Sequence, residues 1–162
     1  MSIGVLLLVL AAAGQPPAVG TFSVASADGQ AVSAAAVFAG ERKVVVYVAP
    51  AIAPAAPLLE TLRKAYDNAG AFRERWDSRL VVIVASPPAE ARRWLERSWG
   101  DGDLPTWYAD PDAAGWRALR FDGTMGVVGT SNGNVEWKLD GVINDPAVLE
   151  PAVRAWIEGS AQ

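Results

Sequence analysis

The sequence predicts an α/β fold in which a central mixed β-sheet is flanked by helices and preceded by an N-terminal β-hairpin. Residues 44–48 and 80–85 are continuous runs of β-branched, aromatic and aliphatic residues, which are typical of strands buried on both faces. Each run is followed by a segment with helical periodicity, and this alternation favours parallel strands joined by crossover helices. Asn132-Gly133 then separates two further strand-like segments and indicates an antiparallel hairpin.

The remaining elements follow from similar signals along the chain. Residues 20–32 contain two short strands around an Asp28-Gly29 turn. From Pro57 the apolar residues recur at three- and four-residue spacing, as in an amphipathic helix. Further helices are predicted after Pro88 and over residues 112–119 and 146–157, and further strands over residues 106–109, 126–130 and 134–139. The 162 residues suffice for one domain with a substantial core, and no internal repeat or interdomain linker interrupts it.

Composition excludes several classes of function. Fourteen Lys and Arg residues stand against 18 Asp and Glu, giving a net charge of −4, and no basic stripe is interleaved with aromatics. Nucleic acid is therefore not an expected partner, because binding to a phosphate backbone needs a basic excess. The chain has no cysteine and no histidine, which excludes disulfides, thiol catalysis and thiolate metal sites and removes the commonest general base.

Motifs that carry nucleotide, metal or acyl chemistry are missing as well. The sequence has no GxxxxGK[ST] loop, no GxGxxG after a strand and no GxSxG elbow. Asp101-Gly102-Asp103 lacks the spacing of a calcium loop and is predicted to be a turn. Roles in turns and as helix N-caps explain this acidic stretch better than a weak cation site does; its members are Asp101, Asp103, Asp110 and Asp112. No cofactor and no metal are therefore expected.

The N-terminal segment, residues 1–17, is set apart from a domain predicted to cover residues 18–162. Its apolar run, residues 3–13, is shorter than the roughly 17–25 residues of a membrane-spanning helix. The run fits the apolar region of a secretory signal with small residues at positions 11–13, although no Lys or Arg precedes it. We expect export to the periplasm or membrane association through this run. The alternatives are a buried strand or helix of the mature fold and a cytoplasmic protein.

Three blocks of the chain carry a resemblance to a known family. Residues 22–32 resemble the hairpin that precedes the central strand of thioredoxin-like proteins, and residues 46–55 resemble their strand-to-active-site segment. Residues 122–128, continued by residues 139–144, resemble the characteristic ending of these proteins, G-x-P followed by G-x-[LV]-[VI]-N. In order and spacing the blocks are similar to the redoxin branch of the thioredoxin superfamily, most of all to its MauD and TlpA types. The resemblance implies a thioredoxin-like fold.

The chain departs from this family at its reactive positions. The resemblance aligns Ile52 with the nucleophilic cysteine, Ala55 with the resolving cysteine and Met125 with a cis-proline that faces the pair. Neither Ile nor Ala can supply the thiolate that attacks a disulfide, and there is no cysteine in any other register. The degenerate site is therefore predicted at Ile52, Ala53, Pro54, Ala55, Thr124 and Met125. These residues either form an apolar docking patch inherited from a substrate groove or simply pack against neighbouring segments.

Two other groups of side chains have competing interpretations. The helical and strand periodicity predicts that most tryptophans pack in or beside the core, with a ligand pocket as the alternative for Trp94, Trp99, Trp107 and Trp116. Several arginines are expected to form a solvated helical face with Glu partners: Arg73, Arg75, Arg92, Arg93 and Arg97.

The leading hypothesis for function is a cysteine-free, redox-inactive thioredoxin-fold protein. It is expected to act as an interaction or structural accessory module for a protein partner, at the cell envelope or in a larger assembly. A second hypothesis is a thiol-independent enzyme that uses Asp or Tyr side chains, which would be supported by two carboxylates converging in a concave site. A third is a small-ligand binder that uses Trp side chains.

Overall fold

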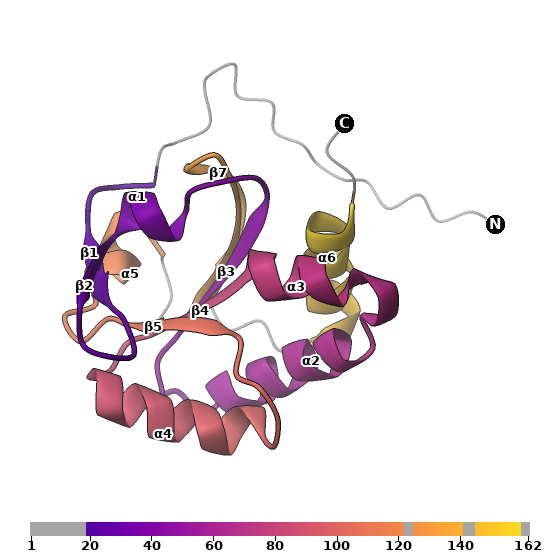
Figure 1. Cartoon of the computed structure of the whole chain (residues 1–162), viewed down its shortest axis with the longest axis horizontal. Coiled ribbons are helices and arrows are strands. Elements are labelled where there is room, and N and C mark those ends of the chain that lie inside the picture. Colours follow the sequence, from indigo (N-terminus) through magenta and orange to yellow (C-terminus); the bar gives the residue numbers. More distant parts are fainter. Residues whose placement is uncertain (1–18, 122–124, 141–144, 160–162) are drawn as a thin grey trace.

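The computed structural model describes residues 19–121, 125–140 and 145–159, and its centre is a seven-stranded mixed sheet in the order β2-β1-β5-β4-β3-β6-β7 (Figure 1). The strands are β1 Ser23–Ala25, β2 Ala31–Ser33, β3 Lys43–Val48, β4 Leu80–Val84, β5 Thr106–Ala109, β6 Gly126–Ser131 and β7 Asn134–Asp140. Strands β3, β4 and β5 are parallel, β6 and β7 add antiparallel pairs on one side, and the β1–β2 hairpin pairs antiparallel with β5 on the other. The predicted mixed sheet and both predicted hairpins are confirmed.

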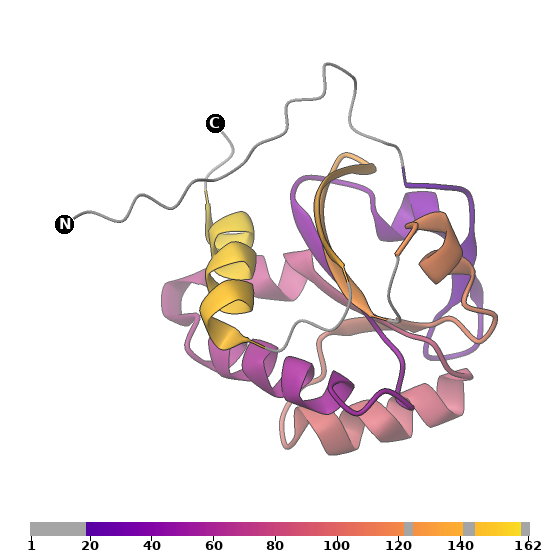
Figure 2. The same ribbon diagram turned by 180° about the vertical axis from the view of Figure 1, so that it is seen from behind.

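Helices cover both faces of this sheet (Figures 1 and 2). They are α1 Ala34–Val37, α2 Ala55–Asp67, the 3-10 helix η1 Gly70–Phe72, α3 Arg73–Arg79, α4 Pro88–Trp99, α5 Ala114–Ala118 and α6 Pro146–Glu158. Buried side chains of α2, α3, α4 and α6 pack with Val44 and Val46 on one face of the sheet. The short helices α1 and α5 pack with Val45 and Tyr47 on the opposite face. Because both faces are covered, residues 44–48 and all of β4 are buried, as predicted.

Three helices differ from the sequence-based prediction. Helix α2 begins at Ala55 rather than at Pro57, because proline is tolerated in the first turn of a helix. Helices α1 and α3 have no predicted counterpart. Helix α1 has only four residues, which is too short for an apolar period to appear in the sequence. Helix α3 has seven residues but buries only Trp76, so its sequence shows no repeated apolar position.

Side chains of α3 hold the C-terminal end of α6 through a group of contacts that we name the α6 clasp: Arg75, Trp76, Arg79, Arg154 and Glu158. The guanidinium of Arg75 donates to the carbonyl oxygen of Glu158, and that of Arg79 donates to the carbonyl oxygen of Ile157 at 2.8 Å. The Glu158 carboxylate accepts from Trp76 Nε1 at 2.9 Å and from Arg154 at 2.7 Å. The clasp therefore satisfies carbonyl groups that the end of a helix leaves unpaired.

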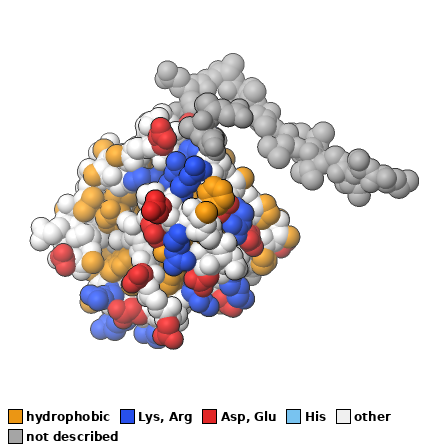
Figure 3. All heavy atoms as spheres, turned by 45° about the vertical axis from the view of Figure 1, so that its right-hand side comes forward, with side chains coloured by type: hydrophobic (Ala, Val, Ile, Leu, Met, Phe, Trp, Pro, Cys, Tyr) orange, Lys and Arg blue, Asp and Glu red, His pale blue; other side chains and the backbone are white. Residues whose placement is uncertain are grey.

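The prediction of a solvated arginine face is wrong for Arg75, whereas Arg73 is exposed as predicted. The Arg73 guanidinium lies 3.5 Å from the centre of the Tyr66 ring, and Arg75 is half-buried in the α6 clasp. A helical sequence pattern could not reveal these roles, because the partners come from other helices. The prediction is confirmed for Arg92, which pairs with Glu96 at 3.0 Å. Figure 3 shows basic and acidic side chains interspersed on the face that comes forward when the right-hand side of Figure 1 is turned to the viewer.

All seven tryptophans lie among the described residues, and none of them is exposed. Trp76 and Trp99 are buried in the core, while Trp137 and Trp156 contact each other edge to face with ring centres 6.0 Å apart. The prediction that most tryptophans serve packing is confirmed.

The predicted N-terminal segment, residues 1–17, lies outside the described residues, as does Thr124. Their predicted roles stay predictions. Among the helices that the structure describes, none combines the length and the apolar character needed to cross a membrane.

Candidate functional site

The carboxyl ends of β3, β4 and β5 meet at one edge of the sheet. The chain leaves β3 for α2 and β4 for α4 on one face, but it leaves β5 for α5 on the other face. Connections that depart to opposite faces open a crevice beyond the strand ends, where open α/β sheets bind their ligands. The segment with the degenerate positions follows β3 and therefore lies at this edge.

The structure divides the predicted site residues into surface and buried positions. Ala53 is exposed, while Ile52 and Pro54 are half-buried. Ala55 and Met125 are both 0% exposed, so neither can contact a partner directly. Of the predicted docking patch, Ile52, Ala53 and Pro54 thus remain available at the surface.

Two backbone hydrogen bonds shape this surface segment. The N–H of Ile52 donates to the carbonyl of Ala49 at 3.0 Å, and the N–H of Ala55 donates to the carbonyl of Ile52 at 3.0 Å. These successive turns place Ile52 between the end of β3 and the start of α2, where its side chain packs against the main core. At the start of a helix a cysteine would have a lowered pKa and would be reactive. The same position here carries a hydrocarbon side chain.

A small pocket of about 180 Å³ lies beside Ile52, and we name it the carboxyl-edge pocket. It is lined by Tyr47, Ala49, Ile52, Ala85, Ala113 and Trp116. Tyr47 is buried, whereas the other lining residues are half-buried, so the pocket opens to the surface. Trp116, one of the tryptophans with two interpretations, therefore packs beside the second core cluster and also forms a wall of this pocket.

A buried carboxylate, Asp110, joins α5 to β3 behind this pocket. Asp110 is 1% exposed and its oxygens accept hydrogen bonds from the Tyr47 hydroxyl at 2.8 Å and from the backbone N–H groups of Ala114 at 3.0 Å and Gly115 at 2.8 Å. A Cβ atom on Gly115 would lie 3.0 Å from the Phe22 ring and 3.1 Å from Asp110, so glycine permits the close approach. The interpretation of Asp110 as a residue that caps a helix is confirmed.

Tyr47 keeps its proton in this environment. Burial raises the pKa of the Tyr47 hydroxyl far above its usual range, and the hydrogen bond to Asp110 raises it further. Sequence reasoning did not pair these two residues. The only signals are a tyrosine within an otherwise aliphatic strand and an aspartate directly after another strand, and parallel pairing of β3, β4 and β5 brings both to the same edge.

The arrangement is suited to binding rather than to proton transfer or nucleophilic attack. The pocket lining contains no carboxylate, hydroxyl or amine other than the Tyr47 hydroxyl, which is engaged by Asp110. Within the described ranges, no group of three or more Asp or Glu residues is placed to hold a metal ion. The converging carboxylates that would support a thiol-independent enzyme do not line this pocket.

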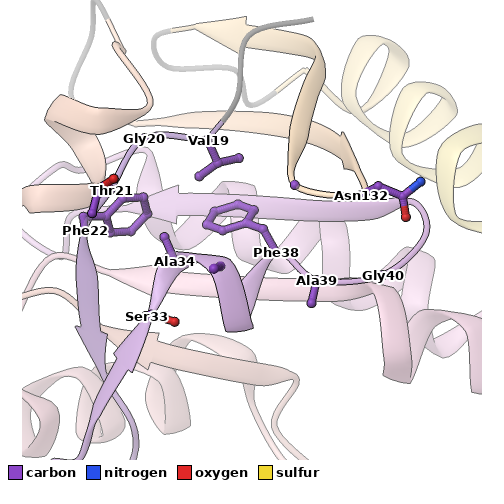
Figure 4. A pocket seen from close by; sticks show the side chains of 12 residues that line it. Val19, Gly20, Thr21, Phe22, Ser33, Ala34, Phe38, Ala39, Gly40 and Asn132 are labelled. Carbon is purple, nitrogen blue, oxygen red and sulfur yellow. The ribbon is translucent and has the colours of Figure 1, made fainter.

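A second, larger cavity of about 530 Å³ lies near the amino end of β3, between α1 and the β6–β7 turn (Figure 4). The rings of Phe22 and Phe38 meet edge to face in its wall, with centres 6.0 Å apart. Val19 contributes to the wall, and its N–H donates to the carbonyl of Gly133 at 2.9 Å. No sequence pattern indicates this cavity, because its walls come from segments far apart in the chain.

Comparison with known proteins identifies the fold. No protein-family model matches the sequence, and no curated protein matches it. Among solved structures, the thiol:disulfide interchange protein DsbE of Chlorobium tepidum superposes with a TM-score of 0.65 at 15% identity, over 89% of this chain and 98% of its own. A secreted disulfide oxidoreductase of Mycobacterium tuberculosis gives 0.60 at 11% identity, over 86% and 96%. StoA of Bacillus subtilis gives 0.57 at 13% identity, over 84% and 98%.

These likenesses define a class of protein by its fold. The chain has the thioredoxin-like fold, with a mixed sheet flanked by helices, as predicted. It has this fold without a single cysteine, so the Cys-x-x-Cys motif of the resembling family is lost. The narrower resemblance to the MauD and TlpA types stays a prediction.

Proposed function

We propose that this protein is a redox-inactive thioredoxin-fold module that binds a protein partner, as an accessory or structural subunit of MauD or TlpA type. The observation that carries the proposal is that a half-buried isoleucine, Ile52, stands where the resemblance places the nucleophilic cysteine. Ile52 lies in the turn that precedes α2, beside exposed Ala53 and the carboxyl-edge pocket. Apolar side chains at this position can still contact a partner protein, although the thiols that would react with it are absent.

We propose further that the protein works outside the cytoplasm. The oxidoreductase from Mycobacterium tuberculosis is described as secreted, and another similar structure is an exposed lipoprotein thioredoxin of Streptococcus pneumoniae. The apolar run of residues 3–13 supports the same location, because it fits the apolar region of a secretory signal. Cell fractionation with an antibody against the full chain tests this part, and recovery only in the cytoplasm would contradict it.

The binding role is tested by affinity capture of the full-length protein from its own organism. We expect the wild type to retain a partner in stoichiometric amount and Ala53→Glu to lose it, because a charge would be placed on the exposed part of the patch. Ala155→Glu is the matched control. Ala155 is exposed on α6 and lies away from the patch. Its neighbour Trp156 donates to the carbonyl of Lys43 at the amino end of β3, whereas the patch follows the carboxyl end of that strand.

Two results would overturn the proposal. One is equal capture by the wild type and Ala53→Glu at equal thermal stability. The other is turnover in a disulfide-reduction assay by the purified wild type, with an oxidised protein as substrate and a thiol as reductant.

A further inference from the structure

Four of the six side chains that line the carboxyl-edge pocket are aliphatic: Ala49, Ile52, Ala85 and Ala113. Its lining surface is almost wholly apolar, and the hydroxyl of the lining residue Tyr47 donates to Asp110 at 2.8 Å. A charged or strongly polar group would lose its water here without compensation, which costs free energy. The occupant that suits this pocket is therefore neutral and apolar.

The size of the pocket limits that occupant further. Its volume of about 180 Å³ is close to that of an apolar cavity of about 150 Å³ that holds benzene in another protein. Pockets that enclose a drug-sized molecule measure about 300 Å³ or more. The volume therefore fits a group of one six-membered ring.

Small side chains at three separate positions create this room. Ala49 follows β3, Ala85 follows β4, and Ala113 precedes α5. Ala113 has the left-handed backbone angles φ 52° and ψ 33°, a conformation that is strained for a residue other than glycine. Strain of this kind concentrates at binding sites. Any larger residue at Ala49 or Ala85 would occupy the pocket.

The aromatic walls of the pocket are held in place before anything binds. Asp110 links the Tyr47 hydroxyl to the first N–H groups of α5, the helix that carries Trp116. A wall that is already ordered loses little conformational freedom on binding. Offset and edge-to-face contacts between aromatic rings add to the gain from burial.

We propose that the carboxyl-edge pocket receives one phenylalanine side chain of the protein partner, between the rings of Tyr47 and Trp116. This inference rests on the proposed binding function and names the group that is bound. A side chain carried by a protein is favoured over a free molecule because the pocket is open, and an isolated ring would remain partly in water. Contacts around the rim, at Ile52 and Ala53, would then cover the inserted ring.

The test is a nuclear magnetic resonance titration of the full-length protein with N-acetyl-phenylalaninamide. We expect saturable shifts of the methyl signals of Ala49, Ala85 and Ala113 and of the Trp116 indole, with a millimolar dissociation constant. N-acetyl-alaninamide, which lacks the ring, should cause no saturable shift. Benzylamine, which has the ring with a charge, should bind more weakly than toluene.

Variants that fill the pocket complete the test. Ala85→Leu and, independently, Ala49→Leu should abolish the saturable shifts, while Ala155→Leu on the exposed face of α6 should leave them unchanged. Spectra and melting temperatures establish that each variant is folded. No saturable shift in the wild type, equal binding by a folded Ala85→Leu, or binding of toluene without binding of N-acetyl-phenylalaninamide would overturn the inference.

The outcomes separate this inference from the proposed function. Loss of partner capture in Ala53→Glu without any binding of the phenylalanine probe would leave the module intact and refute the phenylalanine pocket. Saturable probe binding in a protein that captures no partner would refute the accessory role.

Discussion

The α6 clasp and the carboxyl-edge pocket differ in the exposure of their polar groups. The charged side chains of the clasp are partly exposed, whereas the carboxylate behind the pocket is buried. Arg154 of the clasp is 30% exposed and pairs with two carboxylates, while Asp110 behind the pocket is 1% exposed. The hydrogen bonds to Glu150 and Glu158 raise the pKa of Arg154, with its burial acting in the opposite direction. Both regions use their polar groups to position helices. The carboxyl-edge pocket also has an apolar hollow.

This difference indicates a division of labour. The clasp fastens the C-terminal end of α6 to α3. The carboxyl-edge pocket combines walls that hydrogen bonds hold in place with open space beside Ile52. We therefore expect changes in the clasp to alter stability alone, and changes behind the pocket to alter stability and binding together.

The largest expected effect is on the clasp. Trp76→Ala removes a side chain that is 0% exposed and its bond to Glu158, and should lower the free energy of unfolding by about 3–5 kcal/mol. Urea denaturation measures this loss. The folded variant should keep the pocket shifts with N-acetyl-phenylalaninamide, and a loss below about 1 kcal/mol would show that the clasp does not anchor α6.

The next largest effect is expected behind the pocket. Asp110→Ala leaves the Tyr47 hydroxyl and the N–H groups of Ala114 and Gly115 without their acceptor, at a cost of about 2–4 kcal/mol. Asp112→Ala, at an exposed position on the same loop, should stay within about 0.5 kcal/mol of the wild type. Unlike the clasp variant, Asp110→Ala should also weaken probe binding, because α5 loses its fixed position. Equal effects of the two aspartate variants would contradict this assignment.

A smaller effect with a pH signature is expected for Tyr47→Phe. Loss of the bond to a charged carboxylate should cost about 1.5–3 kcal/mol at pH 8. Burial, followed by the bond to Asp110, raises the pKa of Tyr47 in the folded protein, while tyrosine in the unfolded chain ionises near pH 10. Above about pH 10 the unfolded state therefore releases a proton that the folded state keeps, and the contribution of Tyr47 to stability falls as pH rises.

Urea denaturation of both proteins at pH 8 and pH 11 measures this dependence. The stability difference between wild type and Tyr47→Phe should be constant below about pH 10 and shrink by about 1.4 kcal/mol per pH unit above it. A difference that stays the same at both pH values would show that the Tyr47 hydroxyl is not protected by the fold.

The smallest effect concerns a position outside both regions. Thr130 in β6 is 0% exposed, and its hydroxyl has no hydrogen-bond partner among the described residues. Thr130→Val removes this buried hydroxyl at nearly constant shape and should raise the free energy of unfolding by about 0.5–1 kcal/mol. Calorimetry should detect a higher melting temperature, with probe binding unchanged. A destabilised variant would indicate that the hydroxyl is satisfied after all.

The sequence predicted the sheet well because its signals are local. The apolar runs at residues 44–48 and 80–85 and the Asn132-Gly133 turn each depend on neighbouring residues, and each lies in the expected element. Helix α3 was missed because its place depends on a single tryptophan and on bonds to α6, which is remote in sequence. Local pattern carries no information on such pairs.

The place of the candidate site in the chain could be predicted from the sequence, but the burial of its residues and the pocket beside it could not. The resemblance placed Ile52 in the segment that joins a buried strand to a helix, and the structure has this segment between β3 and α2. The burial of Met125 and Ala55 and the pocket between Tyr47 and Trp116 could not be predicted. Both depend on how β3, β4 and α5 pack in space, since the pocket exists only because small residues from three loops meet.

The central claim is that the degenerate site binds a partner through its apolar surface. Calorimetric titration of the purified partner against wild type, Ala53→Glu and Ala155→Glu tests it most directly. We predict that Ala53→Glu binds at least about tenfold more weakly, a loss of about 1.4 kcal/mol or more, while Ala155→Glu binds like the wild type and all melt at the same temperature. Equal dissociation constants for the three proteins would contradict the claim.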